Sequence, residues 1–313
     1  MERRVITILG CTASGKGGLA RALARRLGGE IVSIDSMKVY RGMDIGTAKP
    51  TAAEQASVPH HLIDVVDPWE SFSVARFVEL ADAAVDAIHA RGRPAIAVGG
   101  TVLYFKGFYE GLFDGPSADP ALRAALRQRA AAEGAAALHA ELQQVDPLAA
   151  SRIHPNDLRR IERALEVYQL TGRPISDWQR EWDGGQVRRP DWQWHLIGLS
   201  REKESANKRI NARVQRMVAT GLVDEARRLW SDPRGLSDQA GQAVGYAELF
   251  AHFRGEMSQE RAIEYIKINS RHLAKHQRTW LKRQAGVQWL DVDALQKEEI
   301  IAAALALLES PSA

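Results

Sequence analysis

The sequence predicts an α/β protein: a P-loop NTPase-like parallel sheet flanked by helices, with an all-helical insertion domain. Short apolar runs alternate with amphipathic helical patterns through the first hundred residues, which is typical of a parallel sheet covered on both faces. A glycine-rich segment that ends in lysine follows the first apolar run, as in phosphate-binding loops. After residue 116 the chain becomes rich in alanine, arginine and leucine without a strand pattern, which predicts the helical insertion.

The predicted strands are compact runs rich in β-branched residues, at residues 5–9, 30–34, 62–66, 94–98, 192–199 and 287–291. Apolar residues at helical spacing predict helices at residues 18–27 and 74–90. We therefore expect residues 1–116 and 190–313 to form the P-loop core, with basic helices near its C-terminal end, and residues 117–189 to form the insertion. Glycine and proline punctuate both junctions. A length of 313 residues also exceeds the size at which a single core usually stops growing.

Total charge and cysteine content exclude some classes of protein. The 42 Lys+Arg and 39 Asp+Glu give a net charge of only +3, so the total alone gives no sign of a nucleic-acid partner. The single cysteine, Cys11, excludes an intramolecular disulfide framework and suits a reducing compartment. The first apolar run is shorter than the roughly 7–15 residues of an export signal, and no later run reaches the ~20 residues that span a bilayer. We expect a cytoplasmic protein without a membrane partner, and a monomer.

The predicted phosphate loop consists of Gly10, Cys11, Thr12, Ala13, Ser14, Gly15, Lys16 and Gly17. It matches the G-x-x-x-x-G-K pattern of nucleotide-binding and ATP-binding proteins, in which backbone amides and a helix N-terminus surround phosphate oxygens. Lys16 would add a mobile positive charge, although a glycine-rich turn with an unrelated lysine is the alternative. Gly17 stands where these loops carry the Ser or Thr that binds magnesium, so the metal ligand stays open between Ser14, Thr12 and water.

Local charge contradicts the impression given by the total. No acidic residue occurs between Tyr265 and Leu290, and five of the six Lys and Arg residues there are spaced four, four, three and four apart. On a helix this spacing places them within a sector of ~80°. The residues are Lys267, Arg271, Lys275, Arg278 and Lys282. A solvated face is the common alternative, but no glutamate relieves the repulsion, so the pattern favours contact with a nucleic-acid backbone.

A series of motifs covers nearly the whole chain. They are TASGK at 12–16, EIVSIDS at 30–36, VYRGMDIGTAKP at 39–50, VPHHLID at 58–64, GGTVLYF at 99–105, RIHPND at 152–157, QAVGY at 242–246 and AKHQRTW at 274–280. In content and order this series resembles the tRNA dimethylallyltransferase (tRNA isopentenyltransferase) family. The resemblance implies transfer of a dimethylallyl group from dimethylallyl diphosphate to the exocyclic amine of the adenosine beside the tRNA anticodon. Diphosphate would leave, with Mg²⁺ as cofactor.

The resemblance also implies catalytic roles for Asp35, Thr101, Lys16 and Arg213. Asp35 would be the general base, and its place at the end of the second predicted strand puts it near the phosphate loop. Thr101 would contact substrate, while Lys16 and Arg213 would hold the diphosphate. The alternatives are that Asp35 and Thr101 cap the segments that follow them, and that Arg213 belongs to a solvated basic stripe.

Further residues match positions that contact tRNA in this family. They are Asp35, Ser36, Met37, Lys38, Thr101, Arg123, Arg159, Arg160, Arg163, Gln242, Gly245, Tyr246, Arg271, Lys275 and Arg278. His276 departs from the pattern by replacing a basic residue, which weakens one expected phosphate contact. Two other functions stay open. One is a P-loop small-molecule kinase, which would not need the basic helix. The other is a tRNA-binding homologue that Gly17 has weakened as a catalyst.

Overall fold

A computed structural model describes residues 3–113, 115–182 and 188–309, and it divides the chain into two units. The core unit comprises Met1–Tyr109 and Arg188–Ala313, and the helical unit comprises Glu110–Val187. Each is described by itself. Among the described helices, none combines the length and the apolar character needed to cross a membrane.

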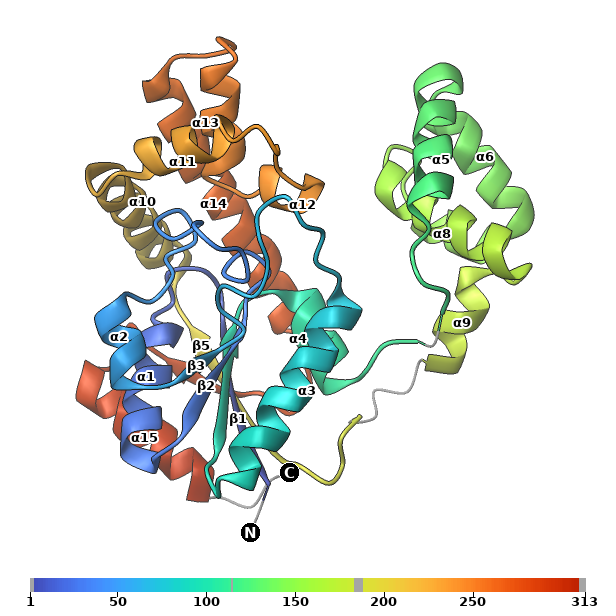
Figure 1. Cartoon of the computed structure of the whole chain (residues 1–313). Coiled ribbons are helices and arrows are strands. Elements are labelled where there is room, and N and C mark those ends of the chain that lie inside the picture. Colours follow the sequence, from blue (N-terminus) through green and yellow to red (C-terminus); the bar gives the residue numbers. More distant parts are fainter. Residues whose placement is uncertain (1–2, 114, 183–187, 310–313) are drawn as a thin grey trace. The chain divides into compact units, whose positions relative to one another are not determined.

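A six-stranded sheet with the order β3-β2-β4-β1-β5-β6 forms the centre of the core unit (Figure 1). Its strands are β1 Arg4–Gly10, β2 Glu30–Ile34, β3 His60–His61, β4 Ala95–Gly99, β5 Gln193–Ser200 and β6 Gln288–Asp291. Every neighbouring pair is parallel, and in the centre Thr7 of β1 lies opposite Ala97 on one side and Leu196 on the other. The predicted fold class is confirmed. Because all the strands run in the same direction, their carboxyl ends lie at one edge of the sheet.

Helices cover both faces of the sheet, as Figure 1 shows for the core unit. Alternate side chains of β1 point to opposite faces, so Val5 and Leu9 join one apolar core while Ile6 and Ile8 join the other. Helices α1 (Lys16–Leu27) and α15 (Lys297–Glu309) pack against the face of Ile6 and Ile8. The opposite core takes up α3 (Val74–Ala90) and α4 (Val102–Tyr109), together with residues of five later helices.

The remaining helices of the core unit frame the carboxyl edge of the sheet or support those that do. They are α2 Ala52–Ser57, α10 Lys203–Ala219, α11 Leu222–Trp230, α12 Asp238–Gly241, α13 Tyr246–Phe253 and α14 Gln259–Leu281. Helix α14 contacts β1, α4, α10 and α13, so it links the sheet to the C-terminal helices. The second half of the core unit therefore builds on the sheet that the first half begins.

The predicted strand at residues 62–66 is wrong. Leu62 and Asp64 have φ angles of 62° and 56°, in the left-handed region that interrupts a strand. The chain turns there, and the Asp64 amide donates to the Lys38 carbonyl at 3.1 Å. Only an isolated bridge between Tyr40 and Val66 follows. An apolar run of strand length is therefore used here to pack a loop.

The helical unit contains α5 Pro120–Glu133, α6 Ala135–Val145, α7 Pro147–Arg152, α8 Leu158–Thr171 and α9 Ile175–Trp182. Aspartates cap three of these helices, and the unit has an apolar core of its own that includes Leu138 and Leu165. It begins earlier than the predicted insertion, 117–189, and ends at Val187. Arg188 and Arg189 belong to the core unit because they form ion pairs with Asp82 and Asp86 of α3.

Candidate active site

The phosphate loop connects the end of β1 at Gly10 to the start of α1 at Lys16. Ala13 and Gly15 have φ angles of 62° and 102°, and the Ser14 amide donates to the Cys11 carbonyl at 3.2 Å. These left-handed residues fold the loop tightly over the first turn of α1. The amides at a helix N-terminus lack carbonyl partners within the helix, so this geometry suits an anion.

Helix α10 packs onto the phosphate loop. Arg213 Nη1 donates to Thr12 Oγ1 at 3.2 Å, and Arg209 Nε donates to the Ala13 carbonyl at 3.2 Å. Ser14 is buried, and its hydroxyl lies beneath the loop, where a Cβ added at Gly10 would come within 2.6 Å of it. The structure thus places Arg213 beside the loop, as the resemblance implies, and buries the Ser14 hydroxyl.

Three cations lie together at this end of the sheet. Burial, followed by the charges of Lys38 and Arg213, lowers the pKa of Lys16 to about 8. Burial is also the main cause that lowers the pKa of Lys38 and the pKa of Arg213, and Asp35 opposes all three shifts. Confining several like charges away from water is unfavourable unless an anion joins them. The site is therefore built to receive a multiply charged anion.

Asp35 and Thr101 follow neighbouring strands, β2 and β4, at the carboxyl edge of the sheet. Asp35 Oδ1 accepts from the amides of Met37 at 3.0 Å and Lys38 at 3.3 Å, so the carboxylate also caps the turn after β2. Thr101 Oγ1 accepts from the Ser36 amide at 3.1 Å and donates to Ser36 Oγ at 3.3 Å. The capping interpretation therefore holds for Asp35, whereas the Thr101 hydroxyl bonds to Ser36 instead of to the amides of α4. These hydrogen bonds fix both side chains at the end of the sheet that carries the phosphate loop.

Gln277 of α14 lies in the AKHQRTW motif but was not among the predicted site residues. Its Oε1 accepts from the Thr12 amide at 2.8 Å, and its Nε2 donates to the Gly100 carbonyl at 2.8 Å. A Cβ at Gly100 would lie 2.6 Å from Gln277 Nε2, so a larger residue would break this bridge. Gln277 thus ties the basic helix to the phosphate loop and to the segment that leads into Thr101. A polar residue at an apolar helix position, three after the buried Ala274, was the available signal.

The loop after Asp35 is anchored by Glu225 of α11. The carboxylate of Glu225 accepts from the amides of Asp44 at 3.0 Å, Ile45 at 2.9 Å and Gly46 at 3.0 Å. Tyr246 completes the arrangement by donating its hydroxyl to Glu225 Oε1 at 2.6 Å. Burial, followed by the charge of Glu225, raises the pKa of Tyr246. One buried carboxylate therefore organises three consecutive backbone amides.

The predicted tRNA contacts at the QAVGY motif need revision in one case. Tyr246 is fully buried, so its side chain supports the loop through Glu225 and is not exposed to a ligand. Gly245 has a φ of 103° and begins α13, where the Glu248 carboxylate accepts from its amide at 2.7 Å. Gln242 is exposed just before it. The motif thus shapes the turn and leaves Gln242 as its accessible member.

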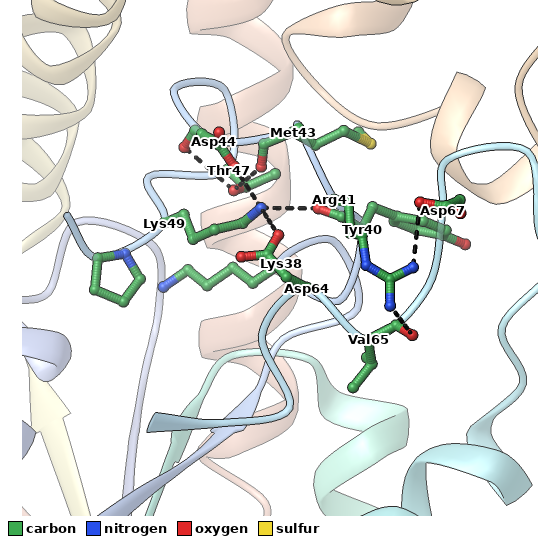
Figure 2. Close-up of polar contacts among 12 residues, drawn as sticks. Lys38, Tyr40, Arg41, Met43, Asp44, Thr47, Lys49, Asp64, Val65 and Asp67 are labelled. Atoms are coloured by element: carbon green, nitrogen blue, oxygen red, sulfur yellow. Dashed lines mark hydrogen bonds and ion pairs between the residues drawn. The ribbon is translucent and has the colours of Figure 1, made fainter. Parts of the chain in front are cut away.

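Lys49 makes further contacts within the same loop, as Figure 2 shows. Its Nζ donates to the Tyr40 carbonyl at 2.8 Å and to Asp64 Oδ1 at 2.6 Å. Arg41 extends the connection by donating to the Val65 carbonyl at 3.1 Å. The Lys38 side chain runs alongside in Figure 2 with no ion pair or hydrogen bond drawn to it.

We expect Glu225→Ala to destabilise the core unit by about 3–5 kcal/mol, because buried amides and the Tyr246 hydroxyl would lose their acceptor. The midpoint of urea unfolding should fall, and the amides of Asp44, Ile45 and Gly46 should exchange hydrogen much faster. Glu79→Ala, at an exposed position of α3, is the control and should change neither quantity. A loss below about 1 kcal/mol for Glu225→Ala would show that water replaces the carboxylate.

The basic surface of α14 is shorter than its sequence predicts. Lys267 is buried and pairs with Glu264, one turn earlier and just outside the acid-free stretch, so it leaves the predicted stripe. Arg271 Nη1 donates to Asn211 Oδ1 of α10 at 2.7 Å, while Lys275 is exposed. We call Arg271, Lys275, Arg278 and Lys282 the α14 basic surface.

The four predicted tRNA-contacting arginines of the helical unit fall into two groups, one that forms internal ion pairs and one that is exposed. Arg123 and Arg163 both pair with the fully buried Glu166, at 2.8 Å and 2.6 Å. Although burial of Glu166 works against its charged form, the hydrogen bonds from these arginines keep its pKa below the usual value. Arg159 and Arg160 are exposed at the start of α8. The predicted tRNA contact at Arg123 therefore lies at a residue that already stabilises its own unit.

The donor groups around the phosphate loop do not form a protein-held site for a divalent metal. Gly17 offers no side-chain oxygen, the Ser14 hydroxyl lies beneath the loop, and Thr12 Oγ1 accepts from Arg213. Within the described ranges there is no group of three or more His, Cys, Asp or Glu residues that could hold a metal ion. Magnesium takes oxygen ligands, many of them from water and substrate phosphates, whereas the side chains beside this loop are mostly cations.

Comparison with known proteins matches this chain almost end to end. Residues 38–284 match the IPP transferase family, and residues 3–65 match the isopentenyl transferase family. The chain belongs to the IPP transferase family. This IPP transferase is 50% identical over 299 residues to the tRNA dimethylallyltransferase of Geobacillus thermodenitrificans, covering 95% of this chain and 93% of that protein. It is 48% identical over 298 residues to that of Anaeromyxobacter dehalogenans, covering 94% and 96%.

Solved structures agree with the sequence relatives. The tRNA isopentenylpyrophosphate transferase of Bacillus halodurans has a TM-score of 0.72 and 42% identity to this IPP transferase, covering 98% of this chain and 96% of that one. A eukaryotic dimethylallyltransferase acting on tRNA gives a TM-score of 0.80 at 27% identity, covering 97% of this chain and 77% of that one. The predicted resemblance is therefore confirmed.

Proposed function

We propose that this IPP transferase moves a dimethylallyl group from dimethylallyl diphosphate to the exocyclic amine of the adenosine beside the tRNA anticodon. The observation that carries the proposal is the placement of a carboxylate, Asp35, beside a phosphate loop crowded by cations. The cations suit the diphosphate, and the carboxylate suits the proton that the amine must lose. The relatives named for this reaction support the same assignment.

In the proposed reaction a carbon–nitrogen bond forms as the carbon–oxygen bond to diphosphate breaks. The proton on the amine nitrogen passes to the carboxylate of Asp35, whose backbone hydrogen bonds hold it in place. Lys16, Arg213 and the loop amides stabilise the negative charge that collects on the departing diphosphate. Thr101, fixed by Ser36, positions the acceptor base. No step requires hydrolysis of a nucleoside triphosphate.

The proposed partners are tRNA and dimethylallyl diphosphate, with the protein acting as a cytoplasmic monomer. The α14 basic surface and the exposed Arg159 and Arg160 provide positive charge for the tRNA backbone. Mg²⁺, the cofactor that the resemblance implies, would enter on the oxygens of the diphosphate itself, because the surrounding side chains offer it no ligand set.

One assay tests the proposal against its alternatives. Purified protein is incubated with labelled dimethylallyl diphosphate and a tRNA that carries adenosine beside the anticodon. We expect label in the tRNA in a molar ratio that approaches one. Tight tRNA binding without label would indicate a tRNA-binding protein that has lost the reaction. Consumption of ATP with a small hydroxylated acceptor would instead indicate a kinase.

The α14 basic surface gives a second prediction. Lys275→Gln combined with Arg278→Gln should weaken tRNA binding by roughly tenfold at physiological salt, since two phosphate contacts are lost. The slope of log K against log salt should become shallower by about 1.4–1.8. Lys297→Gln, exposed on α15, is the matched control and should leave both quantities unchanged. An unchanged slope in the double variant would place the tRNA elsewhere.

A further inference from the structure

A guanidinium group occupies the space beside Gly17 where a phosphate-loop hydroxyl would normally stand. A Cβ added at Gly17 would lie 3.5 Å from Arg21 Nη1, which is the nearest group among the described residues outside the backbone of α1 and the two chain neighbours. Arg21 lies one turn further along α1. In loops of the common pattern the side chain at this position binds magnesium through its hydroxyl. This chain thus puts a fixed positive charge where other loops recruit a divalent ion.

The position of Arg21 is set by the protein before any ligand binds. Its Nη2 pairs with Glu54 Oε1 at 2.5 Å. Glu54 is itself held in a capping box at the start of α2: Thr51 N donates to Glu54 Oε2 at 3.0 Å, and Glu54 N donates to Thr51 Oγ1 at 3.2 Å. The other edge of the guanidinium, Nη1, faces Gly17. An arginine held in this way loses little conformational entropy when it binds an anion.

Arg21 belongs electrostatically to the cation cluster of the site. Its charge is one of the causes, after burial, that lower the pKa of Lys38, and it acts in the same direction on His60. Arg21 therefore joins Lys16, Lys38 and Arg213 as a fourth positive group near the loop. Like charges held close together repel, so a bare divalent ion would be disfavoured here.

We propose that Arg21 takes the place of the magnesium-binding side chain and contacts the diphosphate directly, so that this enzyme binds diphosphate largely without a divalent metal. The proposal rests on the proposed function, since it requires the phosphate loop to hold diphosphate. A guanidinium can donate two parallel hydrogen bonds to phosphate oxygens. In a loop that holds a metal, the waters bound to that metal would supply such hydrogen bonds. Gly17 lacks the hydroxyl that would bind magnesium, and the guanidinium of Arg21 takes over its function toward the diphosphate.

The test is equilibrium binding of inorganic diphosphate, measured by isothermal titration calorimetry in EDTA and in excess Mg²⁺. We expect less than tenfold difference between the two conditions for the wild-type protein. Arg21→Leu should lose roughly tenfold or more in EDTA, which corresponds to about 1.4 kcal/mol, and Mg²⁺ should restore part of the loss. Arg21→Leu combined with Gly17→Ser should bind tightly only with Mg²⁺. Arg25→Leu, exposed one turn further along α1, is the matched control and should behave as wild type.

The outcomes separate this proposal from the proposed function. Wild-type affinity that drops more than a hundredfold in EDTA, or an Arg21→Leu protein that binds as wild type in both conditions, would overturn the role of Arg21 and leave the reaction standing. Absence of diphosphate binding in either condition would overturn the reaction itself. Arg21→Lys, which keeps the charge without the planar fork, should lie between wild type and Arg21→Leu and guards against a folding defect.

Discussion

Asp35→Asn is expected to slow dimethylallyl transfer to tRNA by a factor of about 10²–10⁴ while leaving tRNA affinity within about twofold of wild type. Asparagine keeps an oxygen that can accept from the amides of Met37 and Lys38, so the turn after β2 survives. Its amide cannot accept the proton from the adenosine amine. Single-turnover transfer of label, measured with saturating tRNA and dimethylallyl diphosphate, isolates the chemical step.

Two comparisons make the result on Asp35 specific. Asp35→Ala should lose the proton acceptor and the cap together, so it should add a loss of substrate affinity to the loss of rate. Asp224→Asn, exposed on α11, changes the charge equally and should leave transfer unaffected. If Asp35→Asn retains a tenth of wild-type rate, or weakens tRNA binding tenfold, Asp35 binds tRNA and some other group takes the proton.

The parts of the site that could be predicted are those whose chemistry is local in the chain. The phosphate loop lies within a few residues of β1 and α1, so its glycines and Lys16 already define its geometry. Asp35 could be placed because a residue at the end of a parallel strand must lie at the ligand edge. In both cases the pattern and the structure depend on the same short segment.

The parts that could not be predicted depend on contacts between distant segments. Gln277 meets Thr12 across 265 positions, and Glu225 meets Ile45 across 180, so the local sequence does not identify the partner of either residue. The prediction that Lys267 belongs to the basic stripe was wrong for a related reason. Helical spacing shows on which side of the helix a residue lies, but it does not show which residues pack against that side. Tyr246 matches the family motif, but its side chain is buried and supports a loop through Glu225, so the match does not place the side chain at a binding surface.

The helical unit divides the core unit into halves with different tasks. The strands before it lead into the residues proposed to take part in the reaction, Lys16, Asp35 and Thr101. The helices after it supply the residues that hold those groups: Arg213 and Gln277 contact the phosphate loop, and Glu225 anchors the loop after Asp35. Because α14 carries both Gln277 and the α14 basic surface, the helix proposed to bind tRNA also fixes an amide of the phosphate loop.

Lys16→Met should weaken diphosphate binding by about 10²–10³ near neutral pH and slow transfer at least as much, because it removes the charge next to the leaving group. The advantage of wild type over Lys16→Met should also depend on pH. In the unliganded protein the pKa of Lys16 is lowered to about 8, chiefly by burial and then by Lys38 and Arg213. Bound diphosphate stabilises the ammonium and raises that pKa. Below pH 8 the lysine is already charged and the advantage is constant, whereas above pH 8 binding must take up a proton.

The ratio of the wild-type and Lys16→Met affinities should therefore be flat up to about pH 8 and fall by up to tenfold per pH unit above it. Taking the ratio removes the titration of diphosphate itself, since both proteins meet the same ligand. Lys16→Arg is the control: a guanidinium stays charged throughout this range, so its ratio to Lys16→Met should remain flat to pH 10. A ratio for wild type that is also flat to pH 10 would mean that the pKa of Lys16 in the unliganded protein is not lowered to about 8. The crowding by Lys38 and Arg213 would then have to be relieved by water or by an anion already present in the site.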